Sequence, residues 1–331
     1  MSQAILVTGG AGYIGSHAVL ALIDGGWRPV VLDDLSTGVR AAVPQGVPLV
    51  VADAGDKKAL HATFAEHGIC AVMHFAGSVR VEESVANPLK YYRNNSGVSR
   101  DLVEACVEAS IERLVFSSTA ATYGIPETPK VTEDAPTQPI NPYGWSKLMT
   151  EQVLKDSVAA YPNFKVAILR YFNVAGADPD GRCGQRGENA THLIKVACEV
   201  AAGKRPAMQI FGTDYDTPDG TCVRDFIHVS DLAEAHVAVL NWLATAEQPL
   251  TVMNCGYGRG FSVREVLQTV ERLSGRPLTT VEAPRRAGDP PMLISDPSRL
   301  MKQVGWQPRH NSLETIIETA LNWEHALSRA A

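Results

Sequence analysis

The segment from Ala4 to Asp34 constrains the fold most strongly, because it joins a strand, a glycine-rich turn, a helix and a second strand. Ala4–Thr8 is a short, unbroken apolar run, which is typical of a strand buried on both faces of a parallel sheet. The turn Gly9-Gly-Ala-Gly12-Tyr-Ile-Gly15 follows, then a helical pattern through Ile23 and a strand over 29–32 that ends on two aspartates. This order of elements predicts a dinucleotide site.

Each part of that segment has a physical task in such a site. The glycines let the backbone approach a pyrophosphate, and the amino end of the helix stabilises its negative charge. Asp33 is placed to accept hydrogen bonds from ribose hydroxyls, and its carboxylate would repel a ribose 2′-phosphate. The segment therefore favours NAD over NADP. The spacing Gly-x-x-Gly-x-x-Gly differs from the commoner dehydrogenase pattern Gly-x-Gly-x-x-Gly.

Strands and helices continue to alternate as far as Phe172. We expect further strands over 47–51, 70–75, 113–118 and 166–172, separated by helices over 56–67, about 89–109 and about 143–161. Such alternation predicts an α/β fold, a Rossmann-type doubly wound parallel sheet with a smaller C-terminal substrate-binding lobe. Ligands of these sheets bind beyond the carboxyl ends of the strands, where Ala76-Gly77 and Thr119 stand.

The pattern becomes irregular after Phe172. A polar, glycine-rich loop is expected over 173–188, and the later elements are expected over 190–202, near Phe211, and over 223–228, 229–244, 250–254, 262–274, 298–304 and 312–327. We expect residues 1–172 to form an NAD-binding Rossmann domain, to which segments near 222–255 return. Residues 173–331 are expected to form mainly a lobe that binds the substrate.

Tyr143 and Lys147 are spaced to lie on one face of a helix, one turn apart. A neighbouring ammonium favours the phenolate, which can then accept a proton from an alcohol. The spacing alone is weak evidence, because Tyr-x-x-x-Lys arises by chance and usually marks a solvated helix face.

Composition narrows the range of functions. The chain has 331 residues, of which 45% are hydrophobic, and its formal net charge is −6 with no basic run. We therefore expect neither nucleic acid nor a membrane as a partner. No signal peptide or membrane-length apolar run is apparent, so a cytoplasmic protein is expected. The six cysteines are scattered, which predicts reduced thiols and no metal site.

Several motifs resemble the extended short-chain dehydrogenase/reductase family. They are the glycine turn, His74-Phe-Ala-Gly77, Ser117-Ser-Thr-Ala-Ala-Thr-Tyr-Gly124, the Tyr143/Lys147 pair and Arg170-Tyr-Phe-Asn173. More narrowly, segments 211–225 and 283–289 are similar to the nucleotide-sugar 4-epimerases of that family. The resemblance implies an NAD-dependent isomerase that interconverts UDP-glucose and UDP-galactose. Hydride would pass to and from tightly bound NAD through a 4-keto intermediate. It also implies a homodimer, formed through the helices near 90–109 and 143–161.

The resemblance also implies roles for individual residues. Tyr143, Lys147 and Thr119 would be catalytic, with Lys147 lowering the pKa of the tyrosine. NAD would be held by Gly9, Gly12, Tyr13, Ile14, Gly15, Asp33, Asp34, Leu35, Ser36, Thr37, Asp53, Ala54, Phe75, Ala76, Gly77, Asn94, Tyr143, Lys147 and Phe172. The UDP-sugar would be held by Thr119, Tyr143, Asn173, His192, Leu193, Phe211, Arg224, Arg286, Asp289 and Leu293. Val79 stands where family members often have lysine.

Other functions are weighed against this one. A sugar-nucleotide dehydratase needs an acid and a base after Thr119, and Ala120-Ala121 cannot transfer protons. The UDP-binding motifs argue against a simple alcohol dehydrogenase. A non-catalytic, dinucleotide-sensing regulator is a further alternative, although such proteins commonly lose the tyrosine and lysine kept here. An epimerase of UDP-N-acetylglucosamine or of a UDP-pentose stays open, because Leu293 is smaller than the tyrosine of strict hexose enzymes.

Overall fold

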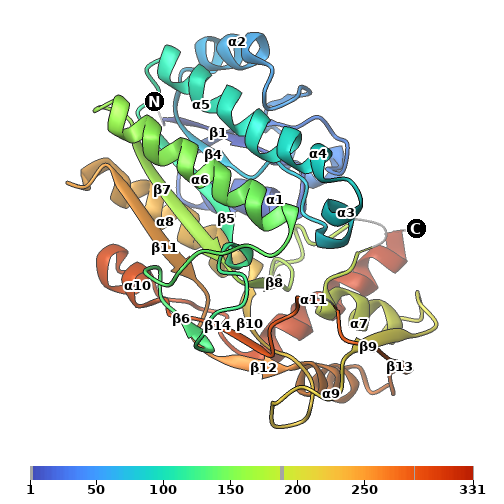
Figure 1. Cartoon of the computed structure of the whole chain (residues 1–331). Coiled ribbons are helices and arrows are strands. Elements are labelled where there is room, and N and C mark those ends of the chain that lie inside the picture. Colours follow the sequence, from blue (N-terminus) through green and yellow to red (C-terminus); the bar gives the residue numbers. More distant parts are fainter. Residues whose placement is uncertain (1–2, 187–189, 287, 331) are drawn as a thin grey trace.

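The centre of the larger lobe is a seven-stranded sheet. The computed structural model describes residues 3–186, 190–286 and 288–330. The strands follow the order β11-β7-β5-β4-β1-β2-β3 and all neighbours are parallel (Figure 1). Their bounds are β1 Ala4–Thr8, β2 Arg28–Leu32, β3 Leu49–Val50, β4 Ile69–His74, β5 Arg113–Thr119, β7 Lys165–Tyr171 and β11 Leu250–Cys255. The predicted doubly wound parallel sheet is confirmed.

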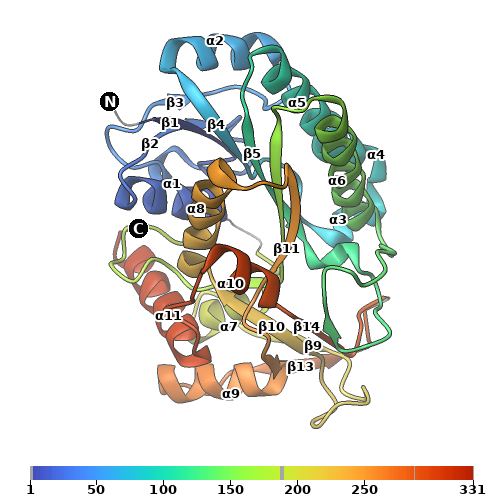
Figure 2. The same ribbon diagram turned by 90° about the vertical axis from the view of Figure 1, so that its left-hand side faces the viewer.

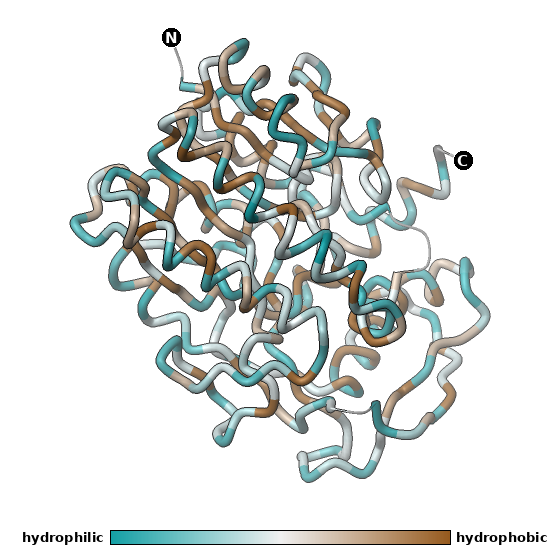
Figure 3. The backbone as a smooth tube through the Cα atoms, turned by 45° about the horizontal axis from the view of Figure 1, so that its top comes forward, coloured by the Kyte–Doolittle hydropathy of each residue, from teal (hydrophilic) through white to brown (hydrophobic). Residues whose placement is uncertain are grey.

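Helices cover both faces of this sheet (Figure 2). Ile5 and Val7 pack with α1 (Tyr13–Asp24), α8 (Val229–Thr245) and α10 (Ser298–Val304). Ala4 and Leu6 point the other way and pack with α2 (Lys57–His67), α5 (Val98–Glu108) and α6 (Pro142–Ala160). Hydrophobic and hydrophilic stretches alternate along the helices (Figure 3), because only one side of each covers the sheet.

The smaller lobe contains two short sheets. One has the order β12-β10-β14-β6, with β8 paired to β10, and the other consists of β13 and β9. These strands are β6 Lys130–Val131, β8 Asn173–Ala175, β9 Met208–Phe211, β10 Val223–His228, β12 Gly260–Ser262, β13 Thr280–Ala283 and β14 Met292–Ser295. A separate core joins β8, β9, β10 and β12 to α7 (Leu193–Ala201), α9 (Val263–Ser274) and α11 (Leu313–Ala330).

The two lobes are built from interleaved parts of the chain. Helix α8 and strand β11 lie in the larger lobe, while β10 just before them lies in the smaller one. In return, β6 from the first half of the chain pairs with β14. No helix in the described part of the chain is long and apolar enough to cross a membrane.

Several expected elements differ in detail from the observed ones. The single helix expected over 89–109 is α4 (Pro88–Tyr91), a π-helical turn (Tyr92–Gly97, η2) and then α5. A helix over Val81–Ala86, α3, precedes them and was not predicted. The strand expected over 47–51 is paired only at β3, and the helix expected from 190 begins at Leu193. Part of the loop expected over 173–188 lies outside the described residues.

Candidate active site

The glycine turn brings β1 and α1 close to the exit of β4. Gly9 has a φ of 71° and its amide donates to the Leu32 carbonyl at 2.9 Å. A Cβ atom at Gly9 would lie 2.7 Å from the Ala76 nitrogen, and one at Gly15 would lie 2.2 Å from the Gly9 oxygen. Only glycine fits both positions, so the turn is a cradle that a side chain would fill.

Helix α1 begins at this turn with its amino end free of a side-chain cap. Gly12 is the residue before the helix, and no side chain in the described ranges caps the first turn there. The first amides of a helix need an outside acceptor and attract negative charge. An uncapped helix end above a glycine cradle fits a pyrophosphate, so the residues present suit a dinucleotide.

Asp33 stands at the end of β2, beside the same turn. Its carboxylate is 7% exposed and accepts hydrogen bonds from the Ala11 and Leu35 amides, both at 2.9 Å. Burial raises the pKa of Asp33, and these two amides act in the opposite direction.

Asp34 accepts from the amide and the hydroxyl of Ser36, at 2.9 and 2.6 Å. The acidic residues thus shape the loop over 33–37, where the sequence predicts the adenosine ribose. Asp53 likewise accepts from the Gly55 amide at 2.7 Å, next to buried Ala54.

The next strand exit is held by a residue that sequence analysis missed. Asn95, 1% exposed, accepts from the Ser78 amide at 2.7 Å and donates to the Ser78 carbonyl at 3.0 Å. It also donates to the Ser146 hydroxyl on α6 at 2.9 Å. The predicted Asn94 makes a longer bond, 3.3 Å, to the Ser78 hydroxyl. The π-helical turn places both asparagines near Gly77, and no pattern in the sequence indicates such a turn.

Helix α6 places Tyr143 and Lys147 at the carboxyl end of β5. Asn141 caps the helix by accepting from the Gly144 amide at 2.9 Å, and Pro142 occupies its first turn. Tyr143 and Lys147 are 7% and 2% exposed. The Lys147 Nζ donates to the Ser117 carbonyl at 3.0 Å and lies 4.9 Å from the centre of the Phe116 ring. The pair is therefore buried against the strand, not displayed on a solvated helix face.

Thr119, expected just past β5, is its last residue, and its side chain reaches Tyr143. The threonine is 8% exposed and its Oγ1 accepts from the Ala121 amide at 3.1 Å. It also lies close enough to the Tyr143 hydroxyl to lower the pKa of that group. The structure thus brings the three predicted catalytic residues together.

Burial opposes the predicted effect of Lys147 on Tyr143. Burial raises the pKa of Tyr143 above its usual value, the charge of Tyr171 adds to this, and the Thr119 hydrogen bond only partly opposes it. Burial also lowers the pKa of Lys147 to about 8. Desolvation penalises both charged forms, so the lowering of the tyrosine's pKa by the lysine stays a prediction.

The predicted substrate residues lie mainly on the smaller lobe. Arg224 donates to Asp289 at 3.2 Å, and the Arg286 guanidinium stands 3.8 Å from the centre of the Phe211 ring. Arg286 also pairs with Glu82 of α3 at 3.6 Å. The loop that carries Arg286 therefore contacts the lobe that carries the glycine turn and the catalytic residues.

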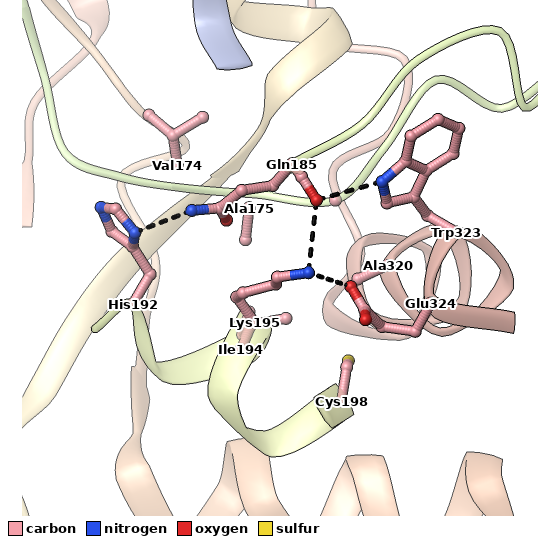
Figure 4. Close-up of a pocket in the computed structure, with 11 residues that line it drawn as sticks. Val174, Ala175, Gln185, His192, Ile194, Lys195, Cys198, Ala320, Trp323 and Glu324 are labelled. Carbon is pink, nitrogen blue, oxygen red and sulfur yellow. Dashed lines mark hydrogen bonds and ion pairs between the residues drawn. The ribbon is translucent and has the colours of Figure 1, made fainter. Parts of the chain in front are cut away.

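The remaining predicted substrate residues fall into two groups. Leu293 is 9% exposed and packs in one small cluster with Phe172, Tyr123, Ala120 and Val131. Asn173 begins β8, Leu193 begins α7, and His192 precedes it. Figure 4 shows the ring of His192 hydrogen-bonded to Gln185, at 3.1 Å, beside the buried pair of Lys195 and Glu324.

The fold and the buried tyrosine and lysine define an extended short-chain dehydrogenase/reductase. The chain belongs to the NAD dependent epimerase/dehydratase family, whose family model matches residues 5–256. It is 56% identical over 329 residues to the UDP-glucose 4-epimerase of Azospirillum brasilense, covering 99% of this chain and 94% of that protein.

Solved structures agree with this assignment. The UDP-glucose 4-epimerase from Brucella ovis in complex with NAD has a TM-score of 0.94 and 44% identity, covering 98% of this chain and 99% of that one. The UDP-Glc/GlcNAc 4-epimerase from Campylobacter jejuni has a TM-score of 0.85 and 48% identity, covering 98% of this chain and 100% of that one. The predicted family is confirmed.

Proposed function

We propose that this protein is an NAD-dependent isomerase that interconverts UDP-glucose and UDP-galactose at C4 of the sugar. The observation that carries the proposal is the buried group of Tyr143, Lys147 and Thr119. It lies in the same lobe as the glycine cradle, and Arg286 of the smaller lobe pairs with Glu82 of that lobe. Similarity to UDP-glucose 4-epimerases over nearly the whole chain supports it.

Three side chains of the protein have separate roles in the proposed reaction. Tyr143 accepts the proton of the sugar 4′-hydroxyl. Thr119 hydrogen-bonds the same sugar hydroxyl and holds it next to the tyrosine. Lys147 contributes positive charge that favours the phenolate. When bound, NAD supplies the carbon that takes the C4 hydride and returns it.

NAD would be held by the residues at the strand exits. The Gly9–Gly15 turn and the amino end of α1 suit its pyrophosphate, and Asp33 suits the adenosine ribose. The Lys147 ammonium would reach the other ribose, near Gly77. Burial raises the pKa of Tyr143, and the positive charge of the oxidised cofactor would favour its ionisation.

The smaller lobe would hold the UDP part. Arg224 and Arg286 offer planar, charged donors of the kind that bind diphosphates in forked pairs. They pair with Asp289 and Glu82, and the diphosphate would replace these carboxylates as their partner. A firmly held nucleotide with few sugar contacts would let the 4-keto sugar turn and receive hydride on its other face.

A second candidate substrate is UDP-N-acetylglucosamine. Leu293 shares a small cluster with Phe172, and leucine leaves more space than tyrosine would at the same place. The Campylobacter jejuni relative is described as acting on both UDP-Glc and GlcNAc substrates. We therefore propose UDP-glucose as the main substrate and the N-acetylated sugar as a slower one.

A homodimer is also part of the proposal. Helices α3 and α4 pack against α6, and the three elements share exposed apolar side chains. These are Val85, Leu89, Trp145 and Met149, of which Leu89 is 78% exposed. An exposed apolar surface of this kind suits a second copy of the chain. A cytoplasmic location and the domain division at residue 172 stay predictions.

The direct test is to incubate the purified protein, without added NAD, with a panel of UDP-sugars and to separate the products by chromatography. We expect UDP-glucose and UDP-galactose to be converted into each other. No conversion of either sugar, or conversion that needs stoichiometric NAD, would contradict the proposal.

A further inference from the structure

A buried ion pair lies one helical turn beyond Lys147. The Glu151 side chain on α6 is fully buried and that of Arg170 on β7 is 3% exposed. The guanidinium donates twice, from Nε to Oε1 at 2.9 Å and from Nη2 to Oε2 at 2.6 Å. Such a forked pair fixes the two side chains in one geometry.

The pair is the centre of a network that reaches the catalytic threonine. The Ser118 hydroxyl donates to Glu151 Oε1 at 2.6 Å, and Ser118 directly precedes Thr119. The Arg170 guanidinium also lies 4.9 Å from the centre of the Tyr123 ring. Tyr123 in turn donates to Asn254 on β11 at 2.6 Å. Glu151 therefore ties α6 directly to β5 and β7, and Arg170 and Tyr123 extend the network to Asn254 on β11.

Resting on the function proposed above, we propose that Glu151 is a positioning residue of the reaction. Its carboxylate fixes the position of α6 on the sheet, and so the position of Tyr143 and Lys147 relative to Thr119. It also adds negative charge one helical turn from Lys147. Ion pairs buried this deeply often contribute little net stability compared with apolar residues of the same size. A positional and electrostatic task accounts for the presence of this pair better than stability does.

The electrostatic part follows from the groups around Lys147. Tyr143 and Glu151 face it from α6, the Ser117 carbonyl and the Phe116 ring from β5, and His74 from β4. Burial lowers the pKa of Lys147 to about 8, and the Glu151 charge opposes this shift. The pKa of His74 is lowered to about 3 by burial and by Lys147, so it adds no charge near neutral pH. Glu151 thus contributes negative charge that opposes the loss of the Lys147 proton.

Three variants separate geometry from charge. Glu151→Asp keeps the charge but shortens the side chain. Glu151→Gln keeps the shape but leaves Arg170 as an unpaired buried charge, which endangers folding. The double variant Glu151→Gln with Arg170→Gln removes both charges, so it leaves no unpaired buried charge to endanger folding.

The readouts are kcat against pH and an NMR titration of Lys147 in protein labelled with ¹³C-lysine. We expect the double variant to lose roughly 10- to 100-fold in kcat with little change in KM, because small misplacements of reacting groups are costly. Its alkaline activity limb and its Lys147 titration should both move to lower pH. Glu151→Asp should lose kcat while both pH midpoints stay in place.

Two outcomes would overturn the inference. One is a folded double variant with the wild-type kcat. The other is a double variant in which the Lys147 titration does not move. If the wild-type protein converts no UDP-sugar, the proposed function fails instead, and the NMR titration still decides whether Glu151 acts on Lys147.

Discussion

Among the single residues of the site, Tyr143 is the one on which the proposed reaction most depends. It is buried, close to Thr119 and one helical turn from Lys147. The spacing of tyrosine and lysine could be predicted from sequence, but the pKa of the tyrosine could not. Its direction depends on how fully the fold removes the phenol from water, which is a property of the packed protein.

Replacing Tyr143 with phenylalanine tests its role. We expect kcat to fall by about 10²–10⁴, because general acid–base catalysis is lost, while NAD stays bound. Turnover is measured with UDP-galactose, and NAD is measured after its release by denaturation. Tyr161→Phe, at the exposed end of the same helix, is the matched control and should behave as wild type. Near-normal turnover of the Tyr143 variant would exclude it as the base.

Leu293→Tyr tests the sugar pocket. The larger side chain should reduce the rate on UDP-N-acetylglucosamine relative to UDP-glucose by about tenfold or more, in line with the discrimination that small changes in pocket size produce. Leu293→Met keeps the volume and should leave the ratio unchanged. An unchanged ratio in the tyrosine variant would show that Leu293 does not limit the pocket.

Helices and strands differ in how far their own residues determine where they form. The strands β1, β4, β5 and β7 and the helices α1, α2 and α6 could be predicted, because they carry apolar runs or caps of sufficient length. The strands β6 and β8 are two and three residues long and owe their existence to the partners β14 and β10. Runs that short carry no periodicity, so sequence alone could not reveal them.

Gly9→Ala tests the cradle at the amino end of α1. The left-handed backbone costs an alanine roughly 1–2 kcal/mol, and its Cβ would also clash with the Ala76 backbone. We expect the variant to purify without NAD. Gly181→Ala is the matched control, because Gly181 has the same φ of 71° with nothing within 4 Å of its Cβ position. Equal loss of NAD in both variants would rule out the clash as the cause.

Stability of the whole molecule is expected to depend on pH through four buried histidines. Burial lowers the pKa of His17 and His236 to about 4, and that of His74 and His228 to about 3. Between pH 6.5 and these values the unfolded chain binds more protons than the folded one. The free energy of unfolding should therefore fall with decreasing pH, by up to about 1.4 kcal/mol per histidine and pH unit.

The carboxyl groups of Asp33 and Asp225 have raised pKa values and flatten this slope in part. The measurement is urea unfolding at a series of pH values between 7 and 4. His236→Phe should move the acid midpoint to lower pH, since that ring makes one hydrogen bond and its Nε2 is without a partner among the described residues. An unchanged midpoint would show that His236 is not among the groups that titrate on unfolding.

Assembly of the molecule is tested at its exposed apolar surface. Leu89→Arg should convert a dimer into a monomer, because a buried charge without a partner is costly in an interface. Size-exclusion chromatography with light scattering gives the mass. Val281→Arg, at an exposed position on β13, should leave the mass unchanged. A monomeric wild-type protein would contradict the proposed dimer.

In the proposed reaction, the hydride removed from C4 returns to C4 of the same sugar within one active site. The most direct measurement uses UDP-glucose that carries deuterium at C4, incubated with the purified protein in ordinary water without added NAD. NMR and mass spectrometry of the UDP-galactose formed then locate the deuterium. We predict that the product keeps deuterium at C4. Product that carries hydrogen from water at C4 would contradict the account.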